Sequence, residues 1–203
     1  MLNPSTIFFS LIGGILPALF WLFFWLREDK LKPEPRSLIM LSFFSGMVVV
    51  VIALFAEKTI KNLITNDILL LAVYAPIVEE VLKFGAAYFS VLRRKENDEP
   101  IDPTIYLITS ALGFAALENV LFLVNPLSES NIITSIATGD LRFIGASLLH
   151  IIASASIGIF IGFAFYKRRI FKFILTIVGL ITAITLHSFF NFFIISGTER
   201  NIF

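Results

Sequence analysis

The sequence predicts an all-α, polytopic membrane protein of about six transmembrane helices, folded as a single domain over residues 1–203. The chain is 57% hydrophobic, with 23 Phe and only 15% charged residues, a composition typical of membrane proteins. Its apolar residues form six runs, each long enough to cross about 30 Å of hydrocarbon as a helix. None of the runs shows the period-two alternation of a transmembrane β-strand.

Short polar linkers separate the predicted spans. The first span is uncharged and is expected to be retained, because a cleaved signal peptide carries its basic residues before the apolar run. The linker after it contains Pro33 and Pro35, which do not allow a continuous helix into the second span. The longest linker, residues 125–142, is polar. The predicted spans are residues 5–26, 38–56, 68–92, 104–124, 143–166 and 173–196.

The basic residues predict the orientation in the membrane. Because cytoplasmic loops carry an excess of Lys and Arg, the linkers after the odd-numbered spans are expected in the cytoplasm and both termini outside. Four basic residues lie on the opposite side: Lys58, Lys61, Arg142 and Arg200. The odd linkers contain Arg27, Lys30, Lys32, Arg36, Arg93, Arg94, Lys95, Lys167, Arg168, Arg169 and Lys172. An integral membrane protein with both termini outside the cytoplasm is therefore expected.

The third span contains two adjacent carboxylates and an ammonium group. A charge near the bilayer centre costs about 2.5–3.5 kcal/mol, so an ionisable residue there indicates a functional site. On a helix Glu79 and Glu80 lie four and three residues before Lys83, so all three side chains reach a common region. The simpler alternative is that Lys83 is a structural partner of a carboxylate, forming a buried ion pair that fixes helix register.

Three further spans carry polar groups at a similar depth. At 1.5 Å per residue, Glu118, His150 and His187 lie roughly 9–14 Å from the outer ends of their helices. Asn191 lies nearer the surface, and Glu79 of the third span lies at roughly 16 Å. They are therefore expected around one water-accessible cavity that opens away from the cytoplasm. Asn119 has a structural alternative, which is to bridge two helices, and each histidine could be a helix-contact residue. The groups are Glu118 and Asn119, His150, and His187 with Asn191.

Peptide hydrolysis is the chemistry that these residue types fit best. It needs a base that activates water and donors that face the developing oxyanion. Glu79 is predicted to be the base, with Glu80 or Glu118 holding it in place. His187 and Asn191 are four residues apart, so they share a helical face and could donate to the oxyanion together. No cofactor is predicted, and the alternative is a divalent metal bound by Glu79, Glu118, His150 and His187.

Three short motifs, all at membrane depth, resemble those of the PrsW family of intramembrane peptidases, within the group that contains the CAAX prenyl proteases and the bacterial CPBP/ABI proteins. The Pro-Glu-Pro stretch after the first span and a histidine early in the fifth span are also similar. The motifs are EExxK (Glu79, Glu80, Lys83), FxxxE followed by Asn (Phe114, Glu118, Asn119) and HxxxN (His187, Asn191).

The resemblance implies a glutamate-dependent protease of a bacterial inner membrane. It would cleave a membrane-anchored protein, such as an anti-sigma factor, at the extracytoplasmic face. It assigns the catalytic glutamate to Glu79, its partner to Glu80, and the groups near the oxyanion to His187 and Asn191. The CAAX branch has His where this chain has Glu118, so prenylated substrates are not expected. His150 is followed four residues later by Ser154, where an acid would be expected, which leaves the role of His150 open.

Other function classes are weighed against this interpretation. A net charge of +1 gives no reason to expect nucleic acid as a partner. The absence of Cys excludes thiol nucleophiles and thiolate metal sites. A proton- or cation-coupled transporter would use the same ionisable groups, but the chain shows no internal repeat, so that alternative would need a homodimer. A non-catalytic family member that acts as a binding or immunity protein is the third alternative.

Overall fold

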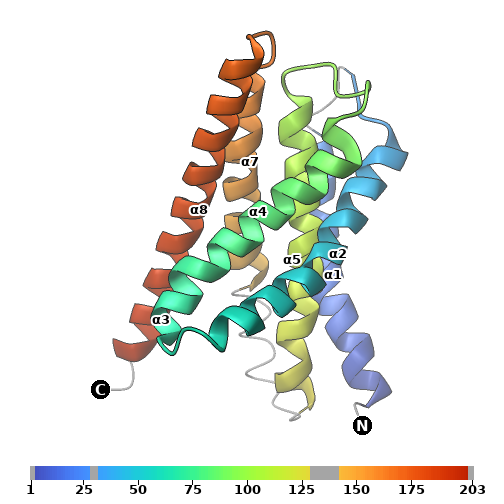
Figure 1. Cartoon of the computed structure of the whole chain (residues 1–203). Helices are drawn as coiled ribbons and strands as arrows, with labels where there is room; N and C mark the ends of the chain where they lie inside the picture. The colour runs from blue at the N-terminus through green and yellow to red at the C-terminus, as the bar shows by residue number, and fades with distance from the viewer. Residues whose placement is uncertain (1–2, 28–31, 129–141, 201–203) are drawn as a thin grey trace.

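A computed structural model describes residues 3–27, 32–128 and 142–200, and every regular element in these ranges is helical (Figure 1). This confirms the predicted fold class. The predicted linker 125–142 falls largely outside the described residues, as do both ends of the chain. The elements are α1 (Pro4–Leu26), α2 (Arg36–Lys61), α3 (Asp67–Leu69), η1 (Leu70–Tyr74), α4 (Ala75–Ala87), η2 (Tyr88–Leu92), α5 (Asp102–Ser128), η3 (Arg142–Ala146), α7 (Ser147–Phe163) and α8 (Arg169–Arg200).

Five of the described helices are long and apolar enough to cross a membrane. They are α1, α2, α5, the helix formed by η3 with α7, and α8, and they correspond to five of the six predicted spans. The remaining predicted span, residues 68–92, is also helical, but the π-helical segment η1 separates α3 from α4, and a second π-helical segment, η2, follows α4. This interrupted helix is the one that carries the charged cluster.

The central helix of the bundle is α5. It packs against α1, α2 and α7, while α8 packs on the far side of α7 and α4 crosses α2, α5 and α8 (Figure 1). In its most apolar window 72% of the α5 residues are buried, compared with 17% in α1 and in α8. Polar residues on α5 therefore face protein on most sides, whereas the outer helices present large apolar side chains to lipid.

Two glycines allow α2 and α5 to cross in close contact. A Cβ on Gly46 would collide with the carbonyl of Ser110, and a Cβ on Gly113 would collide with the carbonyl of Phe43. Small residues at helix crossings are the common way for membrane helices to bring their backbones together. The reciprocal contact fixes α5 against α2, and with it the part of α5 that carries Glu118.

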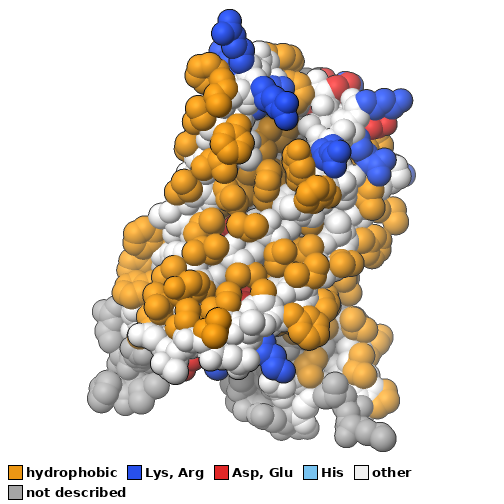
Figure 2. All heavy atoms as spheres, in the orientation of Figure 1, with side chains coloured by type: hydrophobic (Ala, Val, Ile, Leu, Met, Phe, Trp, Pro, Cys, Tyr) orange, Lys and Arg blue, Asp and Glu red, His pale blue; other side chains and the backbone are white. Residues whose placement is uncertain are grey.

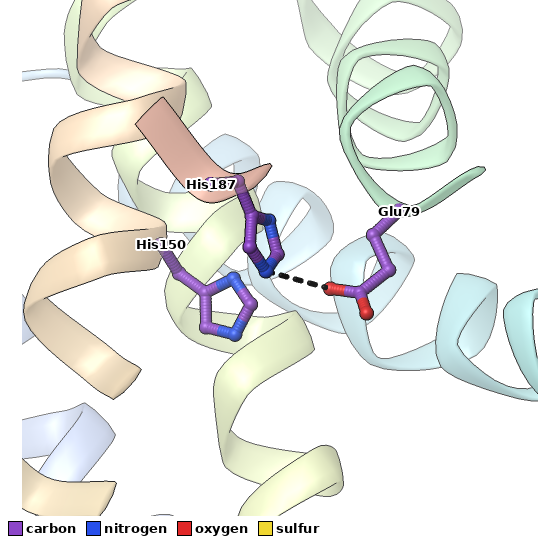
Figure 3. A group of neighbouring side chains, drawn as sticks. All are labelled: Glu79, His150 and His187. Carbon is purple, nitrogen blue, oxygen red and sulfur yellow. Dashed lines mark ion pairs between the residues drawn. The ribbon is translucent and has the colours of Figure 1, made fainter. Parts of the chain in front are cut away.

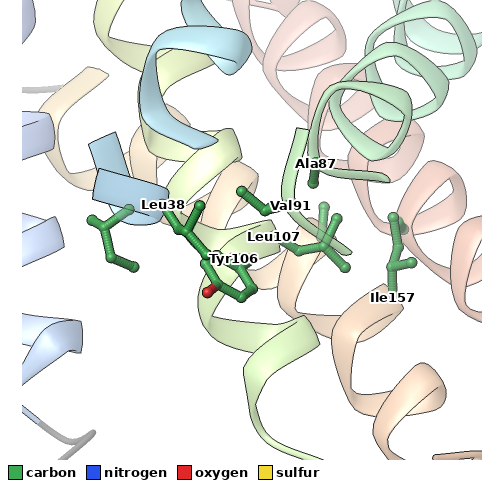
Figure 4. Close-up of a cluster of buried hydrophobic side chains, with 9 residues drawn as sticks. Leu38, Ala87, Val91, Tyr106, Leu107 and Ile157 are labelled. Atoms are coloured by element: carbon green, nitrogen blue, oxygen red, sulfur yellow. The ribbon is translucent and has the colours of Figure 1, made fainter. Parts of the chain in front are cut away.

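A buried apolar cluster lies between α2, α4, η2, α5, α7 and α8 (Figure 4). Its largest member, Tyr106, is fully buried, and its hydroxyl donates a hydrogen bond to Glu34 in the linker before α2. The Pro-Glu-Pro stretch is thereby attached to the core of the bundle. The cluster comprises Leu38, Ile39, Ala87, Val91, Tyr106, Leu107, Ala153, Ile157 and Ala183.

Charged and apolar side chains are separated on the surface. Figure 2 shows Lys and Arg gathered at the end of the molecule where α7 meets α8, above a broad apolar belt. In Figure 1 α1 begins and α8 ends at the opposite end of the bundle. The distribution has the form expected of a polytopic membrane protein with its basic linkers on one side.

Candidate active site

The polar side chains of the bundle surround one pocket of about 810 Å³. Its walls come from α2, η1, α4, α5, η3, α7 and α8, so segments far apart in the sequence contribute. Most of the lining is apolar. Its ionisable side chains are Glu57, Glu79, Glu118, His150 and His187.

At the base of the site, Lys83 and Glu80 form a buried ion pair. Lys83 Nζ lies 2.5 Å from Glu80 Oε1, and both side chains have no exposed surface. The two residues are three apart on α4, which places them on the same helical face. The ammonium group also lies 5.1 Å from the centre of the Phe114 ring, a cation–π contact that adds to its stabilisation.

Each member of the ion pair also contacts one of the two histidines. His187 Nδ1 lies 2.7 Å from Glu80 Oε1, and His150 Nδ1 lies 2.8 Å from Lys83 Nζ. The two imidazole rings are neighbours, with centres 5.2 Å apart and planes at 86°. The pair on α4 thus holds α7 and α8 together through their histidines.

The second nitrogen of each histidine faces a carboxylate on the pocket wall. His150 Nε2 lies 3.1 Å from Glu118 Oε2, which is hydrogen-bonding distance. His187 Nε2 lies 3.9 Å from Glu79 Oε2 (Figure 3). We call Glu80, His187 and Glu79 the His187 arm, and Lys83, His150 and Glu118 the His150 arm.

Glu79 and Glu80 each have a buried Oε2 without a hydrogen bond within the described residues, but of the two carboxylates the one that lines the pocket is Glu79. A buried polar atom without a partner costs about 1–3 kcal/mol, so such atoms mark places where a structure serves a purpose other than stability. A water or a substrate group in the pocket would supply the missing partner.

Asn191 and Asn119 connect helices. Asn191 Nδ2 donates to the carbonyl oxygen of Leu71 at 3.0 Å. That carbonyl lacks its usual donors, because the amide of Ala75 bonds to Leu70 and Pro76 has no N–H. Asn119 Nδ2 donates to Ser147 Oγ at 3.3 Å, joining α5 to α7 as its structural alternative predicted.

One ionisable residue of the pocket was not among the site residues predicted from the sequence. Glu57 lies on α2, one residue beyond the predicted end of the second span, and lines the pocket. Helical periodicity could have found it, because Val50, Ala53 and Glu57 lie on one face, and both apolar members of that set are buried. The site therefore contains a third pocket carboxylate.

A divalent metal is the alternative that the clustered ligands suggest. Candidate ligand atoms of Glu79, His150 and His187 all lie within 4.8 Å of one another. Catalytic zinc sites use three protein ligands, but both nitrogens of His150 already have partners. Of these three residues, Glu79 and His187 have a ligand atom without a hydrogen bond within the described residues, so in this arrangement the three do not fit a three-ligand metal site.

Comparisons with known proteins agree on one family. A family model described as "PrsW family intramembrane metalloprotease" matches residues 34–202, which include every residue of both arms. "Protease PrsW" of Geobacillus kaustophilus (strain HTA426) is 29% identical over 164 residues, covering 79% of this chain and 68% of that protein. The protein of the same name from Bacillus subtilis (strain 168) is also 29% identical over 164 residues, covering 79% and 70%.

A more distant relative covers more of the chain. "Protease PrsW" of Clostridioides difficile (strain 630) is 26% identical over 190 residues, 88% of this chain and 76% of that protein. No solved structure matches.

Proposed function

The chain belongs to the PrsW family of intramembrane proteases, and we propose that in this protease Glu79 activates the water that attacks a peptide bond. It is an integral membrane protein whose substrate is a protein. The observation that carries the assignment is the buried, unpartnered Oε2 of Glu79 on the pocket wall. A general base must reach the proton that it abstracts directly or through one water, and Glu79 Oε2 lies at the pocket wall without a hydrogen bond within the described residues.

The proposed reaction needs no group beyond the chain and water. The Glu79 carboxylate takes a proton from water as the oxygen attacks the carbonyl carbon of the substrate. The same proton then passes to the nitrogen of the leaving amine as the C–N bond breaks. His187 faces Glu79 across 3.9 Å, and its ring is oriented by Glu80, so the water is placed between two fixed groups.

The remaining groups of the pocket are assigned by position. The Asn191 amide uses one N–H for the Leu71 carbonyl, which leaves its second N–H for the developing oxyanion. Glu118 is hydrogen-bonded to His150 and provides a negative charge on the pocket wall. All these residues come from one chain, so we propose that a single copy is sufficient and that a homodimer is not required.

The proposed substrate is a membrane-anchored protein cleaved near the extracytoplasmic face of a bacterial inner membrane, such as an anti-sigma factor. Glu57 and Asn191 support this side, because they lie toward the ends of α2 and α8 that the charge distribution places outside. The wider relationship to CAAX prenyl proteases rests on the motif resemblance alone.

The orientation has a direct test. Reporter tags fused at residues 1 and 203 are expected to report the extracytoplasmic compartment, because the basic linkers at the other end of the helices stay in the cytoplasm. A reporter at residue 203 that is active only in the cytoplasm would reverse the topology and place the pocket mouth inside.

The catalytic assignment is tested with Glu79→Gln. The amide keeps the volume and hydrogen-bonding shape of the side chain but accepts no proton, so proteolysis is expected to stop while the amount of folded protein stays the same. Membrane proteomes of cells that express either form are compared for a single-pass protein that is shortened on its outer side. The matched control is Glu99→Gln, the same change in an exposed loop before α5, which should leave processing intact. Continued processing by the Glu79→Gln protein would refute the assignment.

A further inference from the structure

We propose that Lys83 is a positioning residue that fixes His150 in the tautomer with its hydrogen on Nε2, so that His150 orients Glu118 and is unavailable as a metal ligand. The inference concerns the site of the proposed function, but it does not depend on which bond the protein cleaves. It assigns a role to two residues whose roles the sequence left open.

The argument begins with what an ammonium group can do. It has three N–H donors and no acceptor. His150 Nδ1 lies 2.8 Å from Lys83 Nζ, so Nδ1 must present its lone pair to the ammonium. Both groups are buried, and a hydrogen bond is electrostatically stronger in such a low-dielectric setting than in water. A neutral imidazole with its lone pair on Nδ1 carries its hydrogen on Nε2.

The other side of the ring agrees with this assignment. His150 Nε2 lies 3.1 Å from Glu118 Oε2, and a carboxylate oxygen accepts a hydrogen bond from N–H. Donation from Nε2 fixes the orientation of the Glu118 carboxylate on the pocket wall. The His150 arm is thus a directed chain in which Lys83 donates to His150 and His150 donates to Glu118.

The His187 arm is directed in the opposite sense. Glu80 is an acceptor, so His187 Nδ1 carries a hydrogen and donates it at 2.7 Å. Nε2 of His187 then remains as the nitrogen that faces Glu79 and the pocket. One buried ion pair therefore fixes two neighbouring histidines in opposite tautomers, because its anion holds one ring and its cation holds the other.

This arrangement disagrees with the metal that the family's description implies. A metal ligand must offer a lone pair, and the lone pair of His150 points at Lys83. The ammonium group already fills the cation position between Glu80 and His150. When one ring nitrogen of a histidine binds a metal, the other nitrogen normally carries a hydrogen and donates it to a carboxylate, a backbone carbonyl or water. If Nε2 of His150 bound a metal, the other nitrogen would be Nδ1, and Nδ1 faces the Lys83 ammonium instead of an acceptor.

The test reads the tautomers directly. The full-length protein is purified in detergent with ¹⁵N-labelled histidine, and a two-bond ¹H–¹⁵N correlation spectrum separates N–H nitrogens from lone-pair nitrogens. The chain contains only two histidines, so His187→Gln or His150→Gln leaves one labelled ring and assigns both. We expect His150 to show a hydrogen on Nε2 and a lone pair on Nδ1, and His187 to show a hydrogen on Nδ1. A hydrogen on Nδ1 of His150 would overturn the inference.

A titration with Zn²⁺ tests the second half of the proposal. In the wild-type protein the signals of His150 are expected to stay in place at one equivalent of Zn²⁺, and a shift of its ring nitrogens would refute the proposal. In Lys83→Met the cation is lost, and His150 should no longer hold a single tautomer. A Lys83→Met spectrum identical to that of the wild type would also contradict the role of Lys83. If this variant does not fold, the wild-type spectrum still decides, and neither result depends on proteolysis.

Discussion

Breaking the buried ion pair of α4 should cost far more when one partner is removed than when both are changed. Lys83 and Glu80 have no exposed side-chain surface and lie 2.5 Å apart. Removing one member of such a pair leaves an uncompensated buried charge and costs about 3–5 kcal/mol. Lys83→Met and Glu80→Gln are therefore each expected to lower the free energy of unfolding by about that amount.

The double variant contains neither charge. Glu80→Gln preserves an oxygen acceptor for His187, so the remaining cost is that of lost hydrogen bonds, about 1–3 kcal/mol. The sum of the two single effects is about 6–10 kcal/mol. The double variant should thus be more stable than that sum predicts by about 3 kcal/mol or more, a coupling typical of groups in direct contact.

The measurement is reversible unfolding in mixed detergent micelles, followed by the fluorescence of Trp21 and Trp25 on α1. The matched control is the pair Lys32 and Asp98, which lie 2.6 Å apart with about half of each side chain exposed (54% and 51%). A cycle of Lys32→Met and Asp98→Asn should show coupling below about 1 kcal/mol. If the effects of Lys83→Met and Glu80→Gln add to within about 0.5 kcal/mol, the two buried charges do not stabilise each other and the reasoning is refuted.

Two further predictions concern packing and access. Gly113→Ala places a methyl group against the Phe43 carbonyl of α2 and should destabilise the protein by about 1–3 kcal/mol in the same unfolding experiment. The control is Gly85→Ala, which has open space around it and should be neutral or stabilising by up to about 1 kcal/mol. An equal loss of stability in both variants would exclude the close contact between α5 and α2 at Gly113. The chain has no Cys, so single cysteines report access without background. Phe190→Cys, on the pocket wall, should react with a membrane-impermeant thiol reagent, while Ser147→Cys, fully buried, should not; protection at both positions would indicate a sealed pocket.

The class of fold was predictable because it depends on features that the sequence displays one segment at a time. Long uncharged runs and polar linkers predict helices in a bilayer without knowledge of neighbours. The candidate site was also visible, because Glu79, Glu118 and the two histidines are conspicuous inside apolar runs. The structure brings them around one pocket.

The partners within the site could not be read from the sequence. Spacing placed Lys83 near Glu80 but gave no sign that its ammonium contacts His150 on α7, since that contact depends on how the helices cross. The same limit applies to Asn191, which spacing paired with His187 and the structure pairs with Leu71. Glu57 was missed for a simpler reason, since helix boundaries are uncertain by a few residues.

The hydrogen bond between Asn191 and the Leu71 carbonyl in η1 makes this helix sensitive to a change of one residue in length. A π-helical turn holds one residue more than the α-helical turn that it replaces, so η1 sets the rotational phase between the residues before it and those on α4. Loss of one residue from η1 would restore a regular helix, but it would rotate Leu71 by about 100° relative to Glu79. The carbonyl would turn away from Asn191, and α8 would be left with the contact between His187 and Glu80 to hold it to the helix that carries the charged cluster. A single-residue gap at this point is therefore far more disruptive than its length suggests, whereas the polar linkers can change in length without altering the phase of the site.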